Sequence, residues 1–268
     1  MLSIHSLYKR LVSKDKPEDY LLFEVDETDS TNLHIRELAQ AQGQMATRSV
    51  APVVVLSTDY QTAGRGQGSN TWESERGKNL LFSVLIHPTR VPLERQFLLS
   101  MMGALALKEA LQAYVGADLT LKWPNDIYWK DRKISGTLIE TSLSGGHIKD
   151  CVFGVGINVN QTSFSSALPN PVSLAQIVGH EVERKKLLDR VMTSFVKYLR
   201  LIEEGGYADI SVLYHESLYR KHGFFTYKDN NGTFEAAVVE VEDNGHLVLR
   251  DREGRIREYC LKDIQFVI

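Results

Sequence analysis

The sequence predicts an α+β protein in which a mixed β-sheet with helices packed on it is followed by a small β domain. Three observations support this fold class. The apolar runs at 53–56 and 80–86 are typical of buried strands. Residues 95–115 carry apolar side chains at helical spacing. From Phe224 onward, short extended runs alternate with Asn-Gly and Glu-Gly turns, as in a small all-β unit.

Length and composition agree with this division. The 268 residues are enough for one sizeable core and a small appended domain, which we place at 1–222 and 223–268. The net charge of −3 lacks the basic excess of a nucleic-acid-binding surface, so we expect no nucleic acid partner. Two cysteines are too few for a disulfide framework, and no stretch is long and apolar enough for a membrane span. We therefore expect a cytoplasmic protein that does not bind a membrane.

The N-terminal part begins with a short basic amphipathic segment at 1–16, which lacks the apolar core of a secretory signal, and continues with a strand at 21–25. A helix is expected next, with Ser30 or Thr31 as its N-cap, because such hydroxyls accept hydrogen bonds from the free N–H groups of a first turn. Capping is compatible with binding, since the same hydroxyls suit a polar ligand.

The segment 61–83, QTAGRGQGSNTWESERGKNLLFS, joins one buried strand to the next and is predicted to be a ligand-binding loop. It contains Gly64, Arg65, Gly66, Gly68 and Lys78. Closely spaced glycines let backbone N–H groups approach an anion, and the basic side chains add positive charge. The P-loop and dinucleotide patterns do not fit, because Trp72 and Ser69 stand where glycine is required. A mobile surface hairpin is the alternative, and Trp72 argues against it because tryptophan is costly to expose.

Residues 119–141 are expected to form a β-hairpin next to this loop. A strand that ends at Pro124 resumes as an extended run, turns and returns as a partner strand, which brings Lys133 towards Asp126. A carboxylate and a lysine then share one site, and Gly136 in the strand interior fits the close approach of a ligand or of another backbone. The alternatives are an ordinary turn and a surface lysine.

The rest of the larger domain is expected to supply core and scaffold. Met101 and Met102 of the long helix are assigned to the core. Gly154 and Gly156 end a further strand, where tight strand packing and backbone approach to a ligand are both open. Residues 173–219 are expected to form scaffold helices that are broken at glycines.

Four segments resemble the motifs of biotin protein ligases, in the same order. They are GRGQGSNTW at 64–72, KWPNDIY at 122–128, DRKISGTLIE at 131–140 and GVGINVN at 154–160. Four ordered motifs are far more specific than any one of them. The resemblance is to the monofunctional type, because the roughly 20 residues before the first strand are too few for a helix-turn-helix domain. It implies a catalytic sheet of the biotin/lipoate ligase type and an SH3-like β-barrel at 223–268.

The resemblance implies a reaction in two steps. Biotin is activated with ATP to biotinyl-5′-AMP, and the biotinyl group is then transferred to a specific lysine of the biotin carboxyl carrier domain of a biotin-dependent carboxylase. Mg²⁺ accompanies the phosphates of ATP, and no residue is assigned as a protein ligand of a metal. The oligomeric state stays open between a monomer and a homodimer.

The resemblance also assigns residues. Lys133 is expected to place a positive charge between the biotin carboxylate and the α-phosphate, Arg65 to bind either anion, and Asp126 to orient the attacking amine or take its proton. The residues expected to bind biotin are Ser30, Thr31, Asn32, Gln61, Gly64, Arg65, Gly66, Gln67, Lys133 and Gly136. Those expected to bind the nucleotide are Arg65, Gln67, Trp72, Lys122, Asn125 and Asn158.

Two positions depart from the family pattern. Gln67 and Asn70 stand where arginine is common, so the loop carries less positive charge and lacks a bidentate contact to phosphate at both positions. A lipoate or octanoate ligase of the same fold stays open, although the loop and the KWPND motif favour biotin. A non-catalytic biotin-binding regulator is disfavoured by the presence of Lys133. Transfer through a covalent thioester needs a placed cysteine, and Cys151 lies in an apolar strand.

Overall fold

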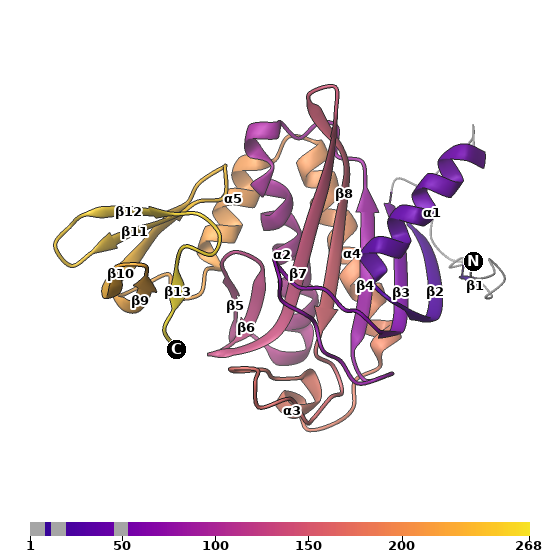
Figure 1. Cartoon of the computed structure of the whole chain (residues 1–268), viewed down its shortest axis with the longest axis horizontal. Helices are drawn as coiled ribbons and strands as arrows, with labels where there is room; N and C mark the ends of the chain where they lie inside the picture. The colour runs from indigo at the N-terminus through magenta and orange to yellow at the C-terminus, as the bar shows by residue number, and fades with distance from the viewer. Residues whose placement is uncertain (1–8, 12–19, 46–52) are drawn as a thin grey trace.

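A mixed eight-stranded sheet forms the larger part of the molecule (Figure 1). The computed structural model describes residues 9–11, 20–45 and 53–268, so all of the segment expected at 1–16 except β1 lies outside the described residues. The strand order is β1-β2-β3-β4-β8-β7-β6-β5, with β2 and β3 parallel and the other neighbours antiparallel. The bounds are β1 Lys9–Leu11, β2 Leu21–Thr28, β3 Val53–Gln61, β4 Leu80–Ile86, β5 Leu119–Lys122, β6 Asp126–Trp129, β7 Arg132–Ser144 and β8 His147–Ile157.

Helices cover both faces of this sheet, which explains the uninterrupted apolar run in β3. They are α1 Thr31–Met45, α2 Phe97–Val115, α3 Leu174–Val178, α4 Arg184–Glu203 and α5 Tyr207–Glu216, with a short 3-10 turn η1 at Leu93–Arg95. Val53 and Val55 belong to the core packed by α2 and α4, whereas Val54 and Leu56 belong to the cluster beneath α1. Because successive side chains of a strand point to opposite faces, a strand buried on both sides is apolar at every position.

Several sequence-based expectations for the larger domain are confirmed. β4 spans the expected 80–86, and the region 119–141 forms the antiparallel strands β5, β6 and β7. Met101 and Met102 are fully buried in α2. α3 ends at Gly179, whose φ of 82° is the left-handed conformation that glycine adopts without strain. None of the helices in the described part of the chain is long and apolar enough to cross a membrane.

Five antiparallel strands form a second, smaller sheet in the order β12-β11-β10-β9-β13 (Figure 1). They are β9 Phe225–Asp229, β10 Gly232–Val241, β11 Leu247–Asp251, β12 Ile256–Tyr259 and β13 Gln265–Phe266. The expected change to short strands after Phe224 is therefore confirmed. The division at 222 and 223 and the SH3-like closure of the sheet into a barrel stay predictions.

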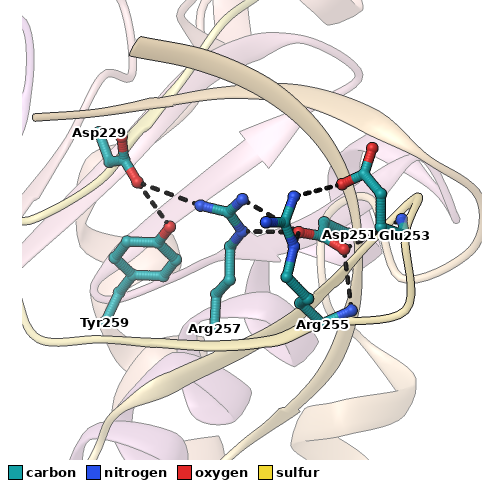
Figure 2. Close-up of polar contacts among 6 residues, drawn as sticks. All are labelled: Asp229, Asp251, Glu253, Arg255, Arg257 and Tyr259. Carbon is teal, nitrogen blue, oxygen red and sulfur yellow. Dashed lines mark hydrogen bonds and ion pairs between the residues drawn. The ribbon is translucent and has the colours of Figure 1, made fainter. Parts of the chain in front are cut away.

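A polar network ties β9, β11 and β12 together (Figure 2). Asp251 is 2% exposed, and its Oδ2 accepts hydrogen bonds from Nε of Arg255 and Nε of Arg257, each at 3.0 Å. Asp229 Oδ2 accepts from the hydroxyl of Tyr259 at 2.9 Å. Desolvation alone raises the pKa of Asp251, but the backbone N–H of Arg255 and the two guanidinium groups outweigh it and hold this pKa below its ordinary value. The network thus stabilises the sheet above the ordinary carboxyl pKa, and this stability is lost as the pH falls through the lowered pKa.

The small sheet is anchored to the larger domain by buried contacts. Trp123 Nε1 donates a buried hydrogen bond of 2.9 Å to the carbonyl of Gly245, in the turn between β10 and β11. Nζ of Lys122 lies 4.7 Å from the ring centroid of Phe266 in β13. Lys122 and Trp123 are the first two residues of the KWPND motif, so the second sheet borders the region of the expected site.

Candidate active site

One cavity collects almost all of the residues that the sequence assigned to binding. Its volume is about 230 Å³, and it lies where the glycine loop meets β7, β8 and the start of α1. It is lined by Ser30, Thr31, Asn32, Gln61, Arg65, Gly66, Gln67, Asn70, Thr71, Trp72, Lys122, Pro124, Asn125, Asp126, Lys133, Gly136, Thr137, Leu138, Gly154, Val155 and Gly156. Of the expected site residues, only Gly64 and Asn158 do not line it. A concave pocket with converging polar groups is the default form of a small-molecule site.

Thr31, Asn32 and Gln61 form a polar wall of the cavity. The backbone N–H of Thr31 donates to Oε1 of Gln61 at 2.8 Å. Ser83 Oγ lies behind the wall, 2.7 Å from Thr31 Oγ1 and 2.6 Å from Asn32 Oδ1. Thr31, Asn32 and Ser83 are all buried. Hydrogen bonds in such a low-dielectric environment hold their partners in one arrangement, so this wall exists before any ligand binds.

Ser83 and Glu140 do not line the cavity but hold residues that do, and sequence reasoning missed both. Nδ2 of Asn32 donates to Glu140 Oε2 at 2.8 Å, and Glu140 Oε1 lies 3.3 Å from Nη2 of Arg65. Glu140 thus connects the polar wall to the arginine of the glycine loop. A signal for Ser83 was present, because it is the only polar residue in the strand LLFSVLI and a buried hydroxyl needs a partner.

Glycines on β7 and β8 leave room for neighbouring side chains. A methyl group at Gly154 would lie 2.3 Å from Asn32 Oδ1, and one at Gly156 would lie 2.3 Å from Cε2 of Trp72. A methyl group at Gly136 would lie 3.2 Å from Cζ3 of the same tryptophan. The space beside these three glycines is therefore filled by side chains and not by a neighbouring backbone.

Trp72 makes the glycine loop part of the cavity. Its side chain is half-buried over β7 and β8, and its Nε1 is buried without a hydrogen-bond partner among the described residues. Its backbone N–H donates to the carbonyl of Gly64 at 3.0 Å, and a methyl group at Gly64 would lie 2.4 Å from the Trp72 carbonyl oxygen. Gly64 thus shapes the loop without lining the cavity. An unpaired buried N–H is costly, and a ligand acceptor would satisfy it.

Lys133 and Asp126 both line the cavity and form an ion pair. Lys133 Nζ lies 2.7 Å from Asp126 Oδ1, and the two side chains are 33% and 14% exposed. The register between β6 and β7 shifts after Ile127, so that Lys133 pairs with Tyr128 while Asp126 pairs with Gly136. This bulge puts Lys133 on the same face of β7 as Gly136, because an extra residue inverts the alternation of side chains. The expected approach of Lys133 to Asp126 is confirmed.

Lys122 adds a second ammonium group on the same side of the cavity. Desolvation lowers the pKa of Lys122 most, and the charge of Lys133 lowers it further, while Asp126 opposes both effects. The result is a pKa below the ordinary value of lysine. An anion that enters the cavity would relieve the repulsion between the two ammonium groups.

Asn158 and Lys78 lie outside the lining of the cavity. Asn158 is buried, its N–H donates to the carbonyl of Ile134 at 2.9 Å, and its Nδ2 donates to the carbonyl of Lys133 at 3.4 Å. It therefore supports the strand end that carries Lys133, and its role in nucleotide binding stays a prediction. Nζ of Lys78 lies 3.2 Å from Oε1 of Glu181. The positive charge that Lys78 was expected to add to the loop is therefore paired with Glu181 outside the cavity.

The cysteines do not contribute to the cavity. Cys151 is fully buried in β8, and burial raises the pKa of its thiol far above the usual value. Cys260 is exposed, and it does not line the cavity either. The geometry of the described residues thus gives no support to a thioester route.

Comparisons with known proteins agree with this site. A model of the Biotin/lipoate A/B protein ligase family matches residues 29–158. The Bifunctional ligase/repressor BirA of Bacillus spizizenii is 30% identical over 243 residues, which cover 90% of this chain and 72% of that protein. The Biotin--[acetyl-CoA-carboxylase] ligase of Paracoccus denitrificans is 30% identical over 241 residues, which cover 85% of this chain and 93% of that protein.

A solved structure extends the likeness to the whole fold. The biotin protein ligase from Aquifex aeolicus, in complex with biotin and ATP, matches with a TM-score of 0.73 and 25% identity, over 92% of this chain and 99% of that one. Fold and cavity together define an ATP-dependent ligase of the biotin and lipoate type. The chain belongs to the Biotin/lipoate A/B protein ligase family, within its biotin protein ligases.

Proposed function

We propose that this protein activates biotin with ATP to biotinyl-5′-AMP and then transfers the biotinyl group to a lysine of a biotin carboxyl carrier domain. The observation that carries the proposal is the placement of the Lys133–Asp126 ion pair in the same cavity as the polar wall. A neutral hydrogen-bonding surface and a cationic group then face one cavity. Biotin needs both, because it has an uncharged ureido ring at one end and a carboxylate at the other.

The polar wall supports binding of the ureido ring. That ring offers two N–H donors and one carbonyl acceptor, and Thr31, Asn32 and Gln61 supply hydroxyl and amide groups on the wall. Their mutual hydrogen bonds hold them in position, so little side-chain entropy is lost when the ligand binds. Ser30, the residue directly before α1, is buried and also lines the cavity.

In the first step the biotin carboxylate attacks the α-phosphorus of ATP, the bond to the bridging oxygen breaks, and pyrophosphate leaves. The protein must hold two anions in line and stabilise the charge that develops on the phosphoryl oxygens. Lys133 is the central cation for this task, and Arg65 is the second. Both are held by carboxylates in the free protein, Lys133 by Asp126 and Arg65 by Glu140, so they are oriented before the anions arrive.

The nucleotide is expected beside Trp72, Lys122 and Asn125. Nδ2 of Asn125 donates to the carbonyl of Thr137 at 2.6 Å, which fixes the turn of the KWPND motif. The carboxylates of Asp126 and Glu140 are already engaged with cations. Mg²⁺ would therefore enter with the phosphates of ATP, where it would neutralise charge on the leaving pyrophosphate.

In the second step the amine of the acceptor lysine attacks the carbonyl carbon of the mixed anhydride, and AMP leaves. The amine must lose a proton, and the carboxylate of Asp126 is placed beside the reacting centre to orient the amine or accept that proton. Lys133 keeps its position next to Asp126 and stabilises the negative charge on the departing phosphate.

The test is mass spectrometry of a biotin carboxyl carrier domain after incubation with this protein, biotin and MgATP. We expect the mass of one biotinyl group to be added, and no addition when the acceptor lysine is replaced by arginine. Lipoate in place of biotin tests the nearest alternative. Modification with lipoate but not with biotin would overturn the proposal, and biotin binding without any modification would indicate a regulator.

We further propose a cytoplasmic protein that does not recognise DNA. The net charge of −3 supplies no drive for counterion release on binding DNA. Fluorescence anisotropy with a labelled duplex is expected to show only weak binding that disappears at physiological salt. Tight binding to one sequence over scrambled controls would contradict this expectation. Light scattering of the same samples distinguishes the monomer from the homodimer.

A further inference from the structure

A turn of the small sheet projects a lysine towards the glycine loop of the larger domain. Residues 260–263 follow β12, and the N–H of Asp263 donates to the carbonyl of Cys260 at 3.2 Å. The N–H of Cys260 in turn donates to Oδ2 of Asp263 at 3.2 Å. Lys262, between them, has a φ of 78°. A lysine in this left-handed region is uncommon and unfavourable, so its position has a cost that a functional contact would explain.

The ammonium group of Lys262 lies directly against Gly68. A methyl group at Gly68 would lie 2.4 Å from Nζ of Lys262 and 2.7 Å from its Cε. Gly68 itself does not line the cavity, but its loop neighbours Gln67 and Asn70 do. The absence of a side chain at Gly68 therefore leaves the space that the Lys262 ammonium group occupies, next to Gln67 and two positions from Asn70.

Lys262 also differs from Arg65 and Lys133 in its partners. Arg65 is paired with Glu140 and Lys133 with Asp126, so each already has a carboxylate neighbour. Lys262 has no ion pair and no side-chain hydrogen bond to any described residue. Its ammonium group thus presents unused donors next to the loop segment 66–70, whose side chains are all uncharged.

The small sheet is held firmly enough to place this lysine. The hydrogen bond from Trp123 to Gly245 and the contact between Lys122 and Phe266 fix the sheet against the KWPND turn. The network around Asp251 fixes β11 to β12, immediately before the turn that carries Lys262 (Figure 2). The position of the ammonium group therefore follows from two anchored elements and not from the side chain alone.

We propose that Lys262 is an anion-binding residue of the active site, which contacts the phosphate of the bound adenylate across Gly68 and supplies the positive charge that Gln67 and Asn70 do not. The inference deepens the proposed function and rests on it. It assigns the small sheet a direct part in retaining the intermediate, because a phosphate bound by Arg65 would lie beside the same loop that the unpaired ammonium group contacts.

The first experiment measures the dissociation rate of preformed biotinyl-5′-AMP from the parent protein, Lys262→Gln and Lys262→Arg. We expect Lys262→Gln to release the adenylate about fivefold faster, as for loss of one partly exposed charge-assisted hydrogen bond, and Lys262→Arg to resemble the parent. Lys228→Gln is the matched control, because Lys228 is an exposed lysine of β9 in the same sheet. Equal rates for Lys262→Gln and Lys228→Gln would overturn the inference.

The second experiment removes the positive charge at position 262 and introduces one at position 67. If Lys262 compensates for Gln67, Gln67→Arg slows adenylate release by a larger factor in the Lys262→Gln background than in the parent, whereas a purely structural role for Lys262 predicts the same factor in both backgrounds. Lys262→Gly separates charge from fold, because glycine adopts a φ of 78° without strain. We expect this variant to melt no lower than the parent and still to release the adenylate faster.

These outcomes are distinct from failure of the proposed function. A parent protein that releases no pyrophosphate from biotin and MgATP would refute the proposed function and this inference with it. A parent that is active, together with Lys262 variants that retain the adenylate normally, would refute this inference alone.

Discussion

The polar wall and the glycine loop face the same cavity but are built in opposite ways. Thr31, Asn32 and Ser83 are buried and joined by side-chain contacts of 2.6 to 2.7 Å. In the loop, Gly68 and Asn70 are exposed, and the internal order comes from backbone hydrogen bonds such as Gly66 N–H to Asn70 carbonyl at 2.8 Å. The wall is formed before binding, whereas the loop has few apolar contacts to hold it. On the proposed roles of the two regions, recognition of biotin and retention of its adenylate would depend on different kinds of structure.

The largest expected effect is at the cationic centre that both regions serve. Lys133→Ala should lower pyrophosphate release from biotin and MgATP by at least about 100-fold, because a cation aimed at developing charge contributes several kcal/mol to transition-state stabilisation. The melting temperature should change little, since the side chain is one-third exposed. Lys149→Ala on β8 is the control, and we expect it to match the parent. Activity within a few-fold of the parent would remove Lys133 from this role.

The next effect separates the wall from the loop directly. Gly154→Ala should weaken biotin binding at least about tenfold, because its methyl group would displace Asn32 from Ser83 and Glu140 and leave buried polar groups unpaired. Gly66→Ala is the matched change in the loop, where the nearest atom to the new methyl group would be 3.1 Å away. We expect it to alter biotin affinity by less than about threefold.

Calorimetric titration of both glycine variants with biotin, alongside thermal melting, provides the comparison. Equal losses of biotin affinity in the two variants would show that biotin binding depends no more on the geometry of the wall than on that of the loop.

The next expected effect is a smaller one, and it is measured by amide hydrogen exchange, which reports directly on backbone order. Residues 30–32 and 83 should be protected with or without ligand, whereas residues 64–70 should gain about tenfold protection only when biotinyl-5′-AMP is bound. The reason is that the adenylate supplies an anion around which backbone N–H groups and Trp72 can settle. Equal protection of 64–70 in the free and bound protein would refute the account of loop closure.

The smallest expected effect concerns one side chain of the loop. Gln67→Arg should slow the release of biotinyl-5′-AMP about fivefold, since a planar cationic fork replaces a neutral amide at the rim of the cavity and adds about 1 kcal/mol of binding free energy. The dissociation rate of preformed adenylate is the measurement. An unchanged rate would show that position 67 does not contact the intermediate.

Much of the fold was predictable because its signals are local. The apolar strand at 80–86, the buried methionines of α2 and the change to short strands after Phe224 all follow from hydrophobic patterns and turn residues. The covering of β3 by helices on both faces is also encoded in its uninterrupted run of apolar residues. The roles of the individual site residues, by contrast, remain predictions that the experiments above test.

The sequence by itself determined which chemical groups are present and, through four ordered motifs, the ligase family to which they belong. Tertiary structure alone decided their directions. The bulge after Ile127 turns Lys133 to the face of Asp126, and the pairing of β4 with β8 brings Ser83 opposite Gly154, beside Asn32. No local pattern predicts these contacts, because each depends on strand register between segments distant in the sequence.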